Sequence, residues 1–155
     1  MKLPNNRILA GLLAFFLVAV AVANAAEKPP GVALKPDITI TDMKIERISS
    51  TPTEDNVRIS VTVMNPVRGT STGPFKIKVE WTENPSAGFT LLGTSGVSNL
   101  VNDPSSIAVR GETRTFDHVV PKGKSYKYRA TADYMSQVAE SNEANNVNSG
   151  GYVAA

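Results

Sequence analysis

The feature that most restricts the fold is a strict alternation of apolar and polar side chains in three separate segments. Every second position is Val or Ile in residues 57–64, is Phe, Ile, Val or Trp in residues 75–82, and is Tyr or Ala in residues 125–133. Successive side chains of a strand point to opposite faces, so a period of two is typical of a strand with one buried face. The three segments are therefore predicted to be half-buried strands.

Weaker patterns predict four further strands, bounded by Pro, Gly, Asn or Asp. They cover residues 37–48, 89–92, 113–120 and 147–153. No segment after residue 35 keeps a helical period for three turns, so about seven strands favour an all-β antiparallel sandwich over an α/β fold. Gly150 and Gly151 weaken the last strand. Residues 83–111, rich in Ser, Gly, Asn and Pro, are predicted to form either a long loop or two weak strands.

The absence of cysteine limits how the fold can be stabilised. Neither a disulfide nor a thiolate metal ligand is available, so the stability must come from an apolar core. The chain after the leader is long enough for one such core and too short for two. A single domain over residues 36–153 is the prediction.

Residues 1–25 have the pattern of a secretory signal peptide. Lys2 and Arg7 precede an apolar run over residues 8–22, and small residues offer a cleavage site after Ala25. The apolar run is about 15 residues long, shorter than the ~20 that a membrane-spanning helix needs. The alternative is an uncleaved membrane anchor, whereas a lipoprotein is excluded because there is no cysteine to acylate. We expect an exported chain, periplasmic, cell-surface or secreted, with no stable membrane insertion after cleavage.

Residues 26–35 hold two prolines and a glycine and are predicted to be a flexible leader. Removing residues 1–25 takes two of the 16 basic residues and leaves 14, equal to the 14 acidic ones. A chain of zero net charge without a basic stripe gives no electrostatic reason to expect nucleic acid or anionic lipid as a partner. We therefore expect another protein or an extracellular polymer as the partner.

Residues 130–146 resemble the C-terminal signature of CARDB domains, the bacterial cell-adhesion-related family. In that signature a strand ends in Asp and is followed by Val, by Glu-Ser-Asn-Glu and by Asn-Asn. The matching residues are Asp133, Val138, Glu140, Ser141, Asn142, Glu143, Asn145 and Asn146. Pro36-Asp37-Ile38, the strand that ends in Asn65, and Pro74-Phe75 resemble earlier parts of the family. The resemblance, over residues 35–153, implies a seven-stranded immunoglobulin-like β-sandwich of exported or surface proteins and no catalytic chemistry.

Two interpretations of these polar residues stay open. Short polar side chains accept hydrogen bonds from backbone N–H groups two or three residues on, and so can hold the corner between the last two strands. Carboxylate and amide oxygens are also the ligands that Ca²⁺ prefers, although their spacing here does not follow the EF-hand pattern. The candidate calcium ligands are Asp133, Glu140, Asn142, Glu143 and Asn145. No other cofactor is expected.

Catalytic motifs have little support in the sequence. His118 is the one histidine, and the neighbouring Asp117 would point to the opposite face of a strand, so the pair does not suit a Ser-His-Asp triad. A nucleophile elbow, a zinc-binding His-Glu-x-x-His helix and a phosphate-binding loop are missing from the sequence. The carboxylate pairs that suit a glycosidase are Glu80 with Glu83 and Glu140 with Glu143. The prediction is a non-enzymatic chain, with a small secreted hydrolase as an alternative.

Aromatic side chains divide into two groups. Three are in phase with apolar neighbours and are predicted to lie in the core: Trp81, Tyr126 and Tyr128. Three others fall in loops or near the C-terminus, where rings can contact a ligand: Phe89, Tyr134 and Tyr152.

The expected function is therefore an adhesion or binding module that recognises another protein or a polymer. Self-association by strand addition is a further hypothesis, motivated by the leader over residues 26–35 and by the glycines of the last strand.

Overall fold

The computed structural model describes residues 33–106 and 111–155, so the predicted signal peptide and most of the leader lie outside the described residues. The strands are β1 Thr39–Ser50, β2 Glu54–Met64, β3 Thr70–Ser71, β4 Phe75–Thr82, β5 Thr90–Val97, β6 Val101–Asn102, β7 Glu112–Pro121, β8 Ser125–Ala132 and β9 Val147–Val153, with one 3-10 turn, η1 Pro85–Ala87. Among these residues no helix has the length and apolar character to cross a membrane.

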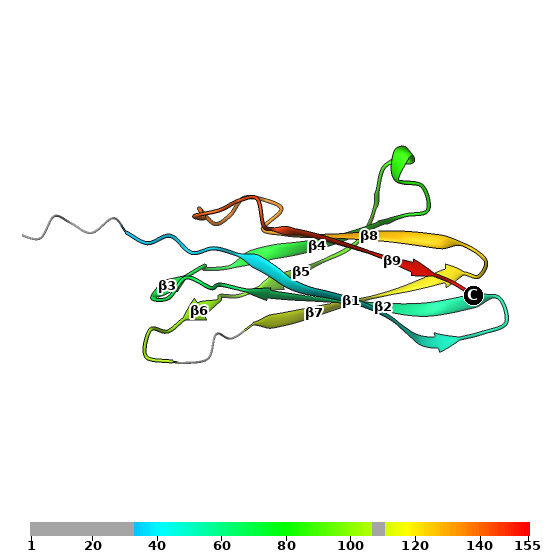
Figure 1. Ribbon diagram of the computed structural model, residues 1–155, viewed down its shortest axis with the longest axis horizontal. Helices are drawn as coiled ribbons and strands as arrows, with labels where there is room; N and C mark the ends of the chain where they lie inside the picture. The colour runs from blue at the N-terminus through cyan, green and yellow to red at the C-terminus, as the bar shows by residue number, and fades with distance from the viewer. Residues whose placement is uncertain (1–32, 107–110) are drawn as a thin grey trace, which may run out of the picture. The chain divides into compact units, whose positions relative to one another are not determined.

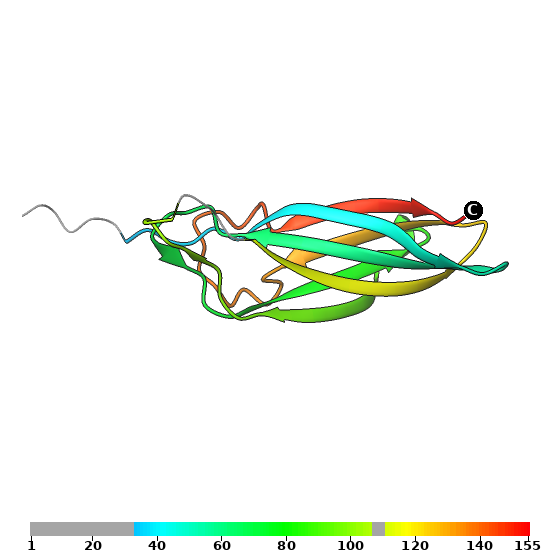
Figure 2. The same ribbon diagram turned by 90° about the horizontal axis from the view of Figure 1, so that it is seen from below.

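The strands form two antiparallel sheets that pack face to face. One sheet has the order β1-β2-β7, the other has the order β5-β4-β8-β9, and the short strands β3 and β6 pair separately. In Figure 1, β4 and β8 lie above β2 and β7, and Figure 2 looks from below onto the β1-β2-β7 sheet. This arrangement confirms the predicted all-β antiparallel sandwich.

The core consists of the apolar phase of the central strands. The fully buried side chains include Val57, Ile59, Val61 and Val63 of β2, Ile77 and Val79 of β4, and Tyr128 and Ala130 of β8. Burying a side chain of the size of Val or Ile contributes about 1.5–3 kcal/mol. The strands predicted from alternation therefore provide most of the apolar stabilisation, and β4 and β9 have the predicted bounds.

The segment over residues 83–111 was predicted to be either a long loop or two weak strands. Its described part, residues 83–106 and 111, contains the strands β5 and β6 and the turn η1. β5 begins one residue after the predicted start and runs on to Val97. Its alternation is hidden because the register with β4 shifts between Val79 and Glu80, and because Gly93 and Ser95 stand at inner positions where apolar residues would continue the pattern. An edge strand with a bulge loses the regular period on which the prediction depends.

The glycines of β9 do not weaken its pairing. All seven residues of β9 pair with β8. A Cβ on Gly150 would lie 2.6 Å from Ile45 Cδ1 of β1, so a larger residue there would require the Ile45 side chain to shift. The first strand thus packs directly against the last one.

Candidate functional site

The polar corner between β8 and β9 is closed by the carboxylate of Asp133. Asp133 is 4% exposed and has a positive φ of 43°. Its Oδ1 accepts from the backbone N–H of Gln137 at 2.8 Å, and its Oδ2 accepts from that of Val138 at 2.9 Å. Asp is one of the few residue types that tolerate the left-handed region, so this residue both turns the chain and binds its orphan donors.

Glu140 connects the same corner to the segment just before β1. Its carboxylate accepts from the backbone N–H of Ile38 and, at 2.8 Å, from Nδ2 of Asn146. Burial raises the pKa of the Glu140 carboxyl above its ordinary value, and these two hydrogen bonds oppose that shift. A buried carboxylate with donors on both oxygens joins residues that are about a hundred positions apart in the chain.

The remaining signature residues make similar short contacts. Glu143 accepts from the Glu140 N–H at 3.1 Å, and Asn142 accepts from the N–H of residue 144 at 3.1 Å. Asn145 Nδ2 donates to Asp37 Oδ1 at 2.9 Å and to Thr39 Oγ1 at 3.0 Å. These are the hydrogen bonds that the turn interpretation requires.

The geometry gives a calcium site no direct support. In the part of the chain that the structure describes, no three His, Cys, Asp or Glu side chains come together as metal ligands would. The oxygens of Asp133 and Glu140 that a cation would need already accept hydrogen bonds. The calcium site stays a prediction.

A third buried carboxylate, Asp55, was not identified by the sequence analysis. Asp55 is 0% exposed and accepts from Ser50 Oγ and from Tyr152 Oη, each at 2.7 Å. These hydrogen bonds, from Tyr152 first and then from Ser50, lower the pKa of the Asp55 carboxyl. The signal in the sequence was the position of Asp55, because it shares the buried phase of β2 with Val57 and Ile59.

His118 lies in an aromatic cluster between the sheets. Its ring centroid is 4.6 Å from that of Trp81, and its Nδ1 is 3.0 Å from Tyr128 Oη. Asp117 points to the other face, where Arg58 donates to both of its oxygens. Burial lowers the pKa of the His118 imidazole. Within residues 33–106 and 111–155, therefore, no carboxylate orients His118 as a catalytic triad requires.

The outer face of the β5-β4-β8-β9 sheet carries four cations, which we call the basic face: Lys76 and Lys78 of β4 and Lys127 and Arg129 of β8. Glu80 is the one acidic residue of these four strands. It accepts from Lys78 at 3.2 Å and from Arg129 at 2.9 and 3.1 Å. Burial opposes its ionisation, but these donors outweigh burial and lower the pKa of Glu80.

Two of the three aromatic candidates flank the basic face. The Arg129 guanidinium carbon lies 4.2 Å from the ring centroid of Phe89, and Lys78 Nζ lies 5.7 Å from that of Tyr134. Both distances fall within the range of cation–π contacts. Tyr152 lies instead on the inner side of β9, where its hydroxyl donates to Asp55. The structure thus brings Phe89 and Tyr134 to one surface and separates Tyr152 from them.

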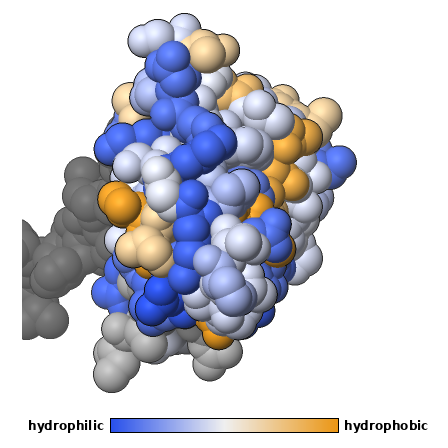
Figure 3. Space-filling model, turned by 90° about the vertical axis from the view of Figure 1, so that its right-hand side faces the viewer, coloured by the Kyte–Doolittle hydropathy of each residue, from blue (hydrophilic) through white to orange (hydrophobic). Residues whose placement is uncertain are grey.

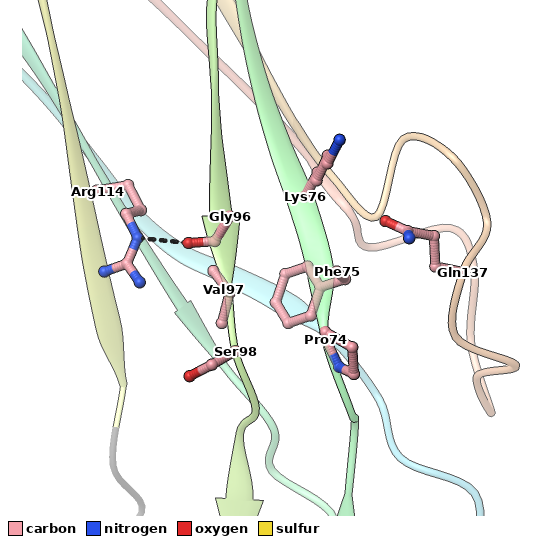
Figure 4. Close-up of a pocket in the computed structure, with 8 residues that line it drawn as sticks. All are labelled: Pro74, Phe75, Lys76, Gly96, Val97, Ser98, Arg114 and Gln137. Carbon is pink, nitrogen blue, oxygen red and sulfur yellow. Dashed lines mark hydrogen bonds between the residues drawn. The ribbon is translucent and has the colours of Figure 1, made fainter.

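A pocket of about 370 Å³ opens at the end of the basic face. Its lining includes the apolar Phe75 and Val97 and the polar Lys76, Arg114 and Gln137, as Figure 4 shows. Arg114 reaches across from β7, and its Nε donates to the carbonyl of Gly96 at 2.9 Å. The apolar part of this hollow is lined by inner-phase side chains, and among the four cations of the basic face it is lined by Lys76.

Hydrophobic side chains do not gather broadly on the end of the sandwich that Figure 3 shows. In that view hydrophilic residues cross the middle, and hydrophobic ones form a narrow strip along one side. Exposed apolar residues that occur singly are normal on a soluble protein surface.

These elements define the chain as an immunoglobulin-like β-sandwich whose last two strands are joined by a polar corner. The chain belongs to the CARDB family, whose profile matches residues 35–150. The crystal structure of the CARDB domain of the PF1109 protein from Pyrococcus furiosus, in complex with di-metal ions, is 21% identical and matches with a TM-score of 0.55 over 77% of this chain and 94% of that chain. The solution NMR structure of the CARDB domain of PF1109 from Pyrococcus furiosus is 20% identical, with a TM-score of 0.54 over 78% and 96%. No curated protein matches the chain.

Proposed function

We propose that this chain is an exported, non-enzymatic module that acts in adhesion at the cell surface or in the periplasm and binds another protein or an extracellular polymer through its basic face. The observation that carries the proposal is the gathering of four cations and two aromatic rings on one sheet. A local field of one sign attracts a partner of the opposite sign even when the charges of residues 26–155 sum to zero. Membership in a non-catalytic domain family supports the non-enzymatic role.

Export is tested by expressing the full chain and sequencing its N-terminus in each cell fraction. We expect a chain that begins at Ala26 in the periplasm or the medium. An intact N-terminus in the membrane fraction would identify the uncleaved anchor instead.

Binding is tested by sedimenting the purified protein with washed cell envelopes. The double variant Lys76→Glu, Lys127→Glu reverses two cations of the basic face, and we expect it to lower the apparent affinity about tenfold or more. The control variant Lys35→Glu, Lys44→Glu makes the same change in net charge outside that face, since Lys44 is an exposed residue of β1. Equal losses in the two variants would contradict the proposal.

Assembly by strand addition is the alternative within the binding class. The edge that motivated it is covered on one side, because β9 packs beside β1 with Gly150 against Ile45. Light scattering decides between the two: a monomer that is unchanged by deleting residues 26–35 argues against strand addition, and oligomers that depend on the leader support it.

Calcium binding at the corner is a second candidate function. One observation favours it, namely that the CARDB domain of PF1109 was solved in complex with di-metal ions. A ligand that binds only the folded state raises the melting temperature. A rise of several degrees in millimolar Ca²⁺ that is lost in a Glu140→Gln, Asn142→Ala variant would identify a metal site. An unchanged melting temperature would leave the corner to its hydrogen bonds alone.

A further inference from the structure

We propose that the ligand of the basic face is an acidic polysaccharide, a polymer whose sugar rings carry carboxylate groups. This inference rests on the proposed binding function and names the class of polymer. It follows from three properties of the surface: its cations without acidic partners, its two aromatic rings, and the hydroxyl groups between them.

The charge of the face is larger than its own ion pairs can neutralise. Lys78 and Arg129 share the single carboxylate of Glu80. Lys76 and Lys127 have no carboxylate within 4.0 Å in the described part of the chain. Lys127 Nζ extends over the next strand, 3.5 Å from the position that a Cβ on Gly151 would take. Two ammonium groups on neighbouring strands are therefore available to carboxylates of a bound polymer.

The spacing of these groups suits an extended, repeating ligand. Lys76 and Lys78 are two residues apart on one strand, which separates them by about 7 Å. Lys127 lies opposite the end of that strand and pairs with Thr82. Cations distributed along and across two strands match charges that recur along a chain better than one concentrated charge.

The aromatic rings and hydroxyls match the rest of a sugar. Phe89 and Tyr134 each stand beside a cation of the face. A half-buried ring offers an apolar surface on which a sugar ring can pack. Thr94, Thr131 and Ser149 lie on the outer phase of β5, β8 and β9. Their hydroxyl groups can hydrogen-bond with sugar hydroxyls, since a hydroxyl is both donor and acceptor.

An acidic protein fits this surface less well. Protein hot spots consist of bulky anchors that fill desolvated pockets at the centre of an interface. The centre of this face consists of half-buried polar and charged side chains of β4 and β8, namely Lys78, Glu80, Arg129 and Thr131, and its hollow lies at one end, beside Lys76. A flat polar surface with a charged middle suits a solvated polymer.

The test measures calorimetric affinity for three uronic-acid polymers: polygalacturonate, alginate and hyaluronate. Fully methyl-esterified polygalacturonate is the matched ligand, because it keeps the sugar chain and loses the charge. We expect at least one acidic polymer to bind, and the ester to bind at least tenfold more weakly than polygalacturonate where polygalacturonate binds. Raising the salt from 50 to 300 mM should weaken binding as the Debye length shortens.

The variants assign that affinity to the face. Lys76→Glu, Lys127→Glu should lower it at least tenfold, while Lys35→Glu, Lys44→Glu should change it less than twofold. Phe89→Ala and Tyr134→Ala should each weaken binding about threefold at high salt, where charge contributes least. Equal affinity for the ester would overturn the role of charge.

Two outcomes separate this inference from the proposed function. If none of the three polymers binds, or single-stranded DNA or an acidic protein binds more tightly, the ligand class is wrong. Envelope binding that still depends on Lys76 and Lys127 would then leave the proposed function standing. If envelope binding is indifferent to both residues, the proposed function is overturned with it.

Discussion

The outer faces of the two sheets differ in how their charges are matched. On the β1-β2-β7 sheet the cations meet acids of the same face: Arg58 donates to both oxygens of Asp117, and Lys44 pairs with Glu46. On the β5-β4-β8-β9 sheet two cations converge on Glu80, and two more have no acidic partner in the described residues. One face neutralises its cations with its own acids, and the other keeps an excess of positive charge.

This difference arises although both sheets follow the same alternation. The inner phase of each strand is restricted by the core, where a change of even one methylene is felt. The outer phase is much less restricted, because an exposed ion pair contributes only about 0–1 kcal/mol. The chemistry of the outer faces can therefore vary with the partner while the fold stays the same.

If the two sheets differ only on their outer faces, matched substitutions on their inner faces should reduce the free energy of unfolding by the same amount. Ile59 of β2 and Ile77 of β4 are both 0% exposed. We expect Ile59→Ala and Ile77→Ala each to reduce the free energy of unfolding by about 2–5 kcal/mol, from lost burial and the cavity left behind. Urea unfolding of the two variants measures this. A large cost in one sheet only would break the symmetry of the inner faces.

The inner faces were also what the sequence revealed best. β2, β4 and β8 were predicted closely because alternation and turn residues agree there. β5 was predicted only as residues 89–92, because its inner phase holds Gly93 and Ser95 in place of apolar residues. As an edge strand with a bulge against β4, it fills less of the core and shows less of the pattern.

The candidate site was harder to predict, since it depends on the register between strands. Phe89 and Tyr134 were named as candidate contact residues, and that role stays a prediction, whereas the lysines of the basic face were not named. Lys76 and Lys127 are far apart in the sequence and come onto the same outer face through the pairing of β4 with β8, near opposite ends of the paired strands. A net charge of zero over residues 26–155 hides an uneven distribution of the charged residues, so composition argued against a basic surface that the fold creates.

The next largest effect on stability is expected from polar groups that link the two sheets. Tyr152 of β9 donates to the buried carboxylate of Asp55 of β2. Because this bond holds the pKa of Asp55 below its unfolded value, it stabilises the fold above about pH 4 and is lost as the pH falls through the folded pKa. We expect Tyr152→Phe to destabilise the protein at pH 7 and to differ much less from the original chain near pH 2. A constant difference over this range, measured by urea unfolding, would contradict the link.

His118 is expected to give a smaller dependence of stability on pH, at a higher pH than Asp55 does. Burial lowers its pKa, so the unfolded chain takes up the proton first as the pH falls below about 6.5. His118 therefore favours folding fully above pH 6.5, and that contribution declines as the pH falls toward its lowered pKa. We expect His118→Phe, which keeps a ring beside Trp81, to flatten the stability between pH 7 and 5. If the free energy of unfolding of His118→Phe depended on pH as strongly as that of the original chain, a group other than His118 would be responsible for the dependence.

The smallest expected effect on stability comes from removing one cation from each of the two outer faces. Arg58→Ala leaves Asp117 without both of its donors, whereas Lys127→Ala removes a cation that has no acidic partner in the described residues. Because exposed ion pairs contribute little, we expect a slight loss of stability for Arg58→Ala and none that can be measured for Lys127→Ala. Binding to an acidic polysaccharide should reverse the order, falling for Lys127→Ala and staying unchanged for Arg58→Ala. If Lys127→Ala were the more destabilising of the two, its charge would serve the sheet, and the distinction between a self-neutralised face and a binding face would fail.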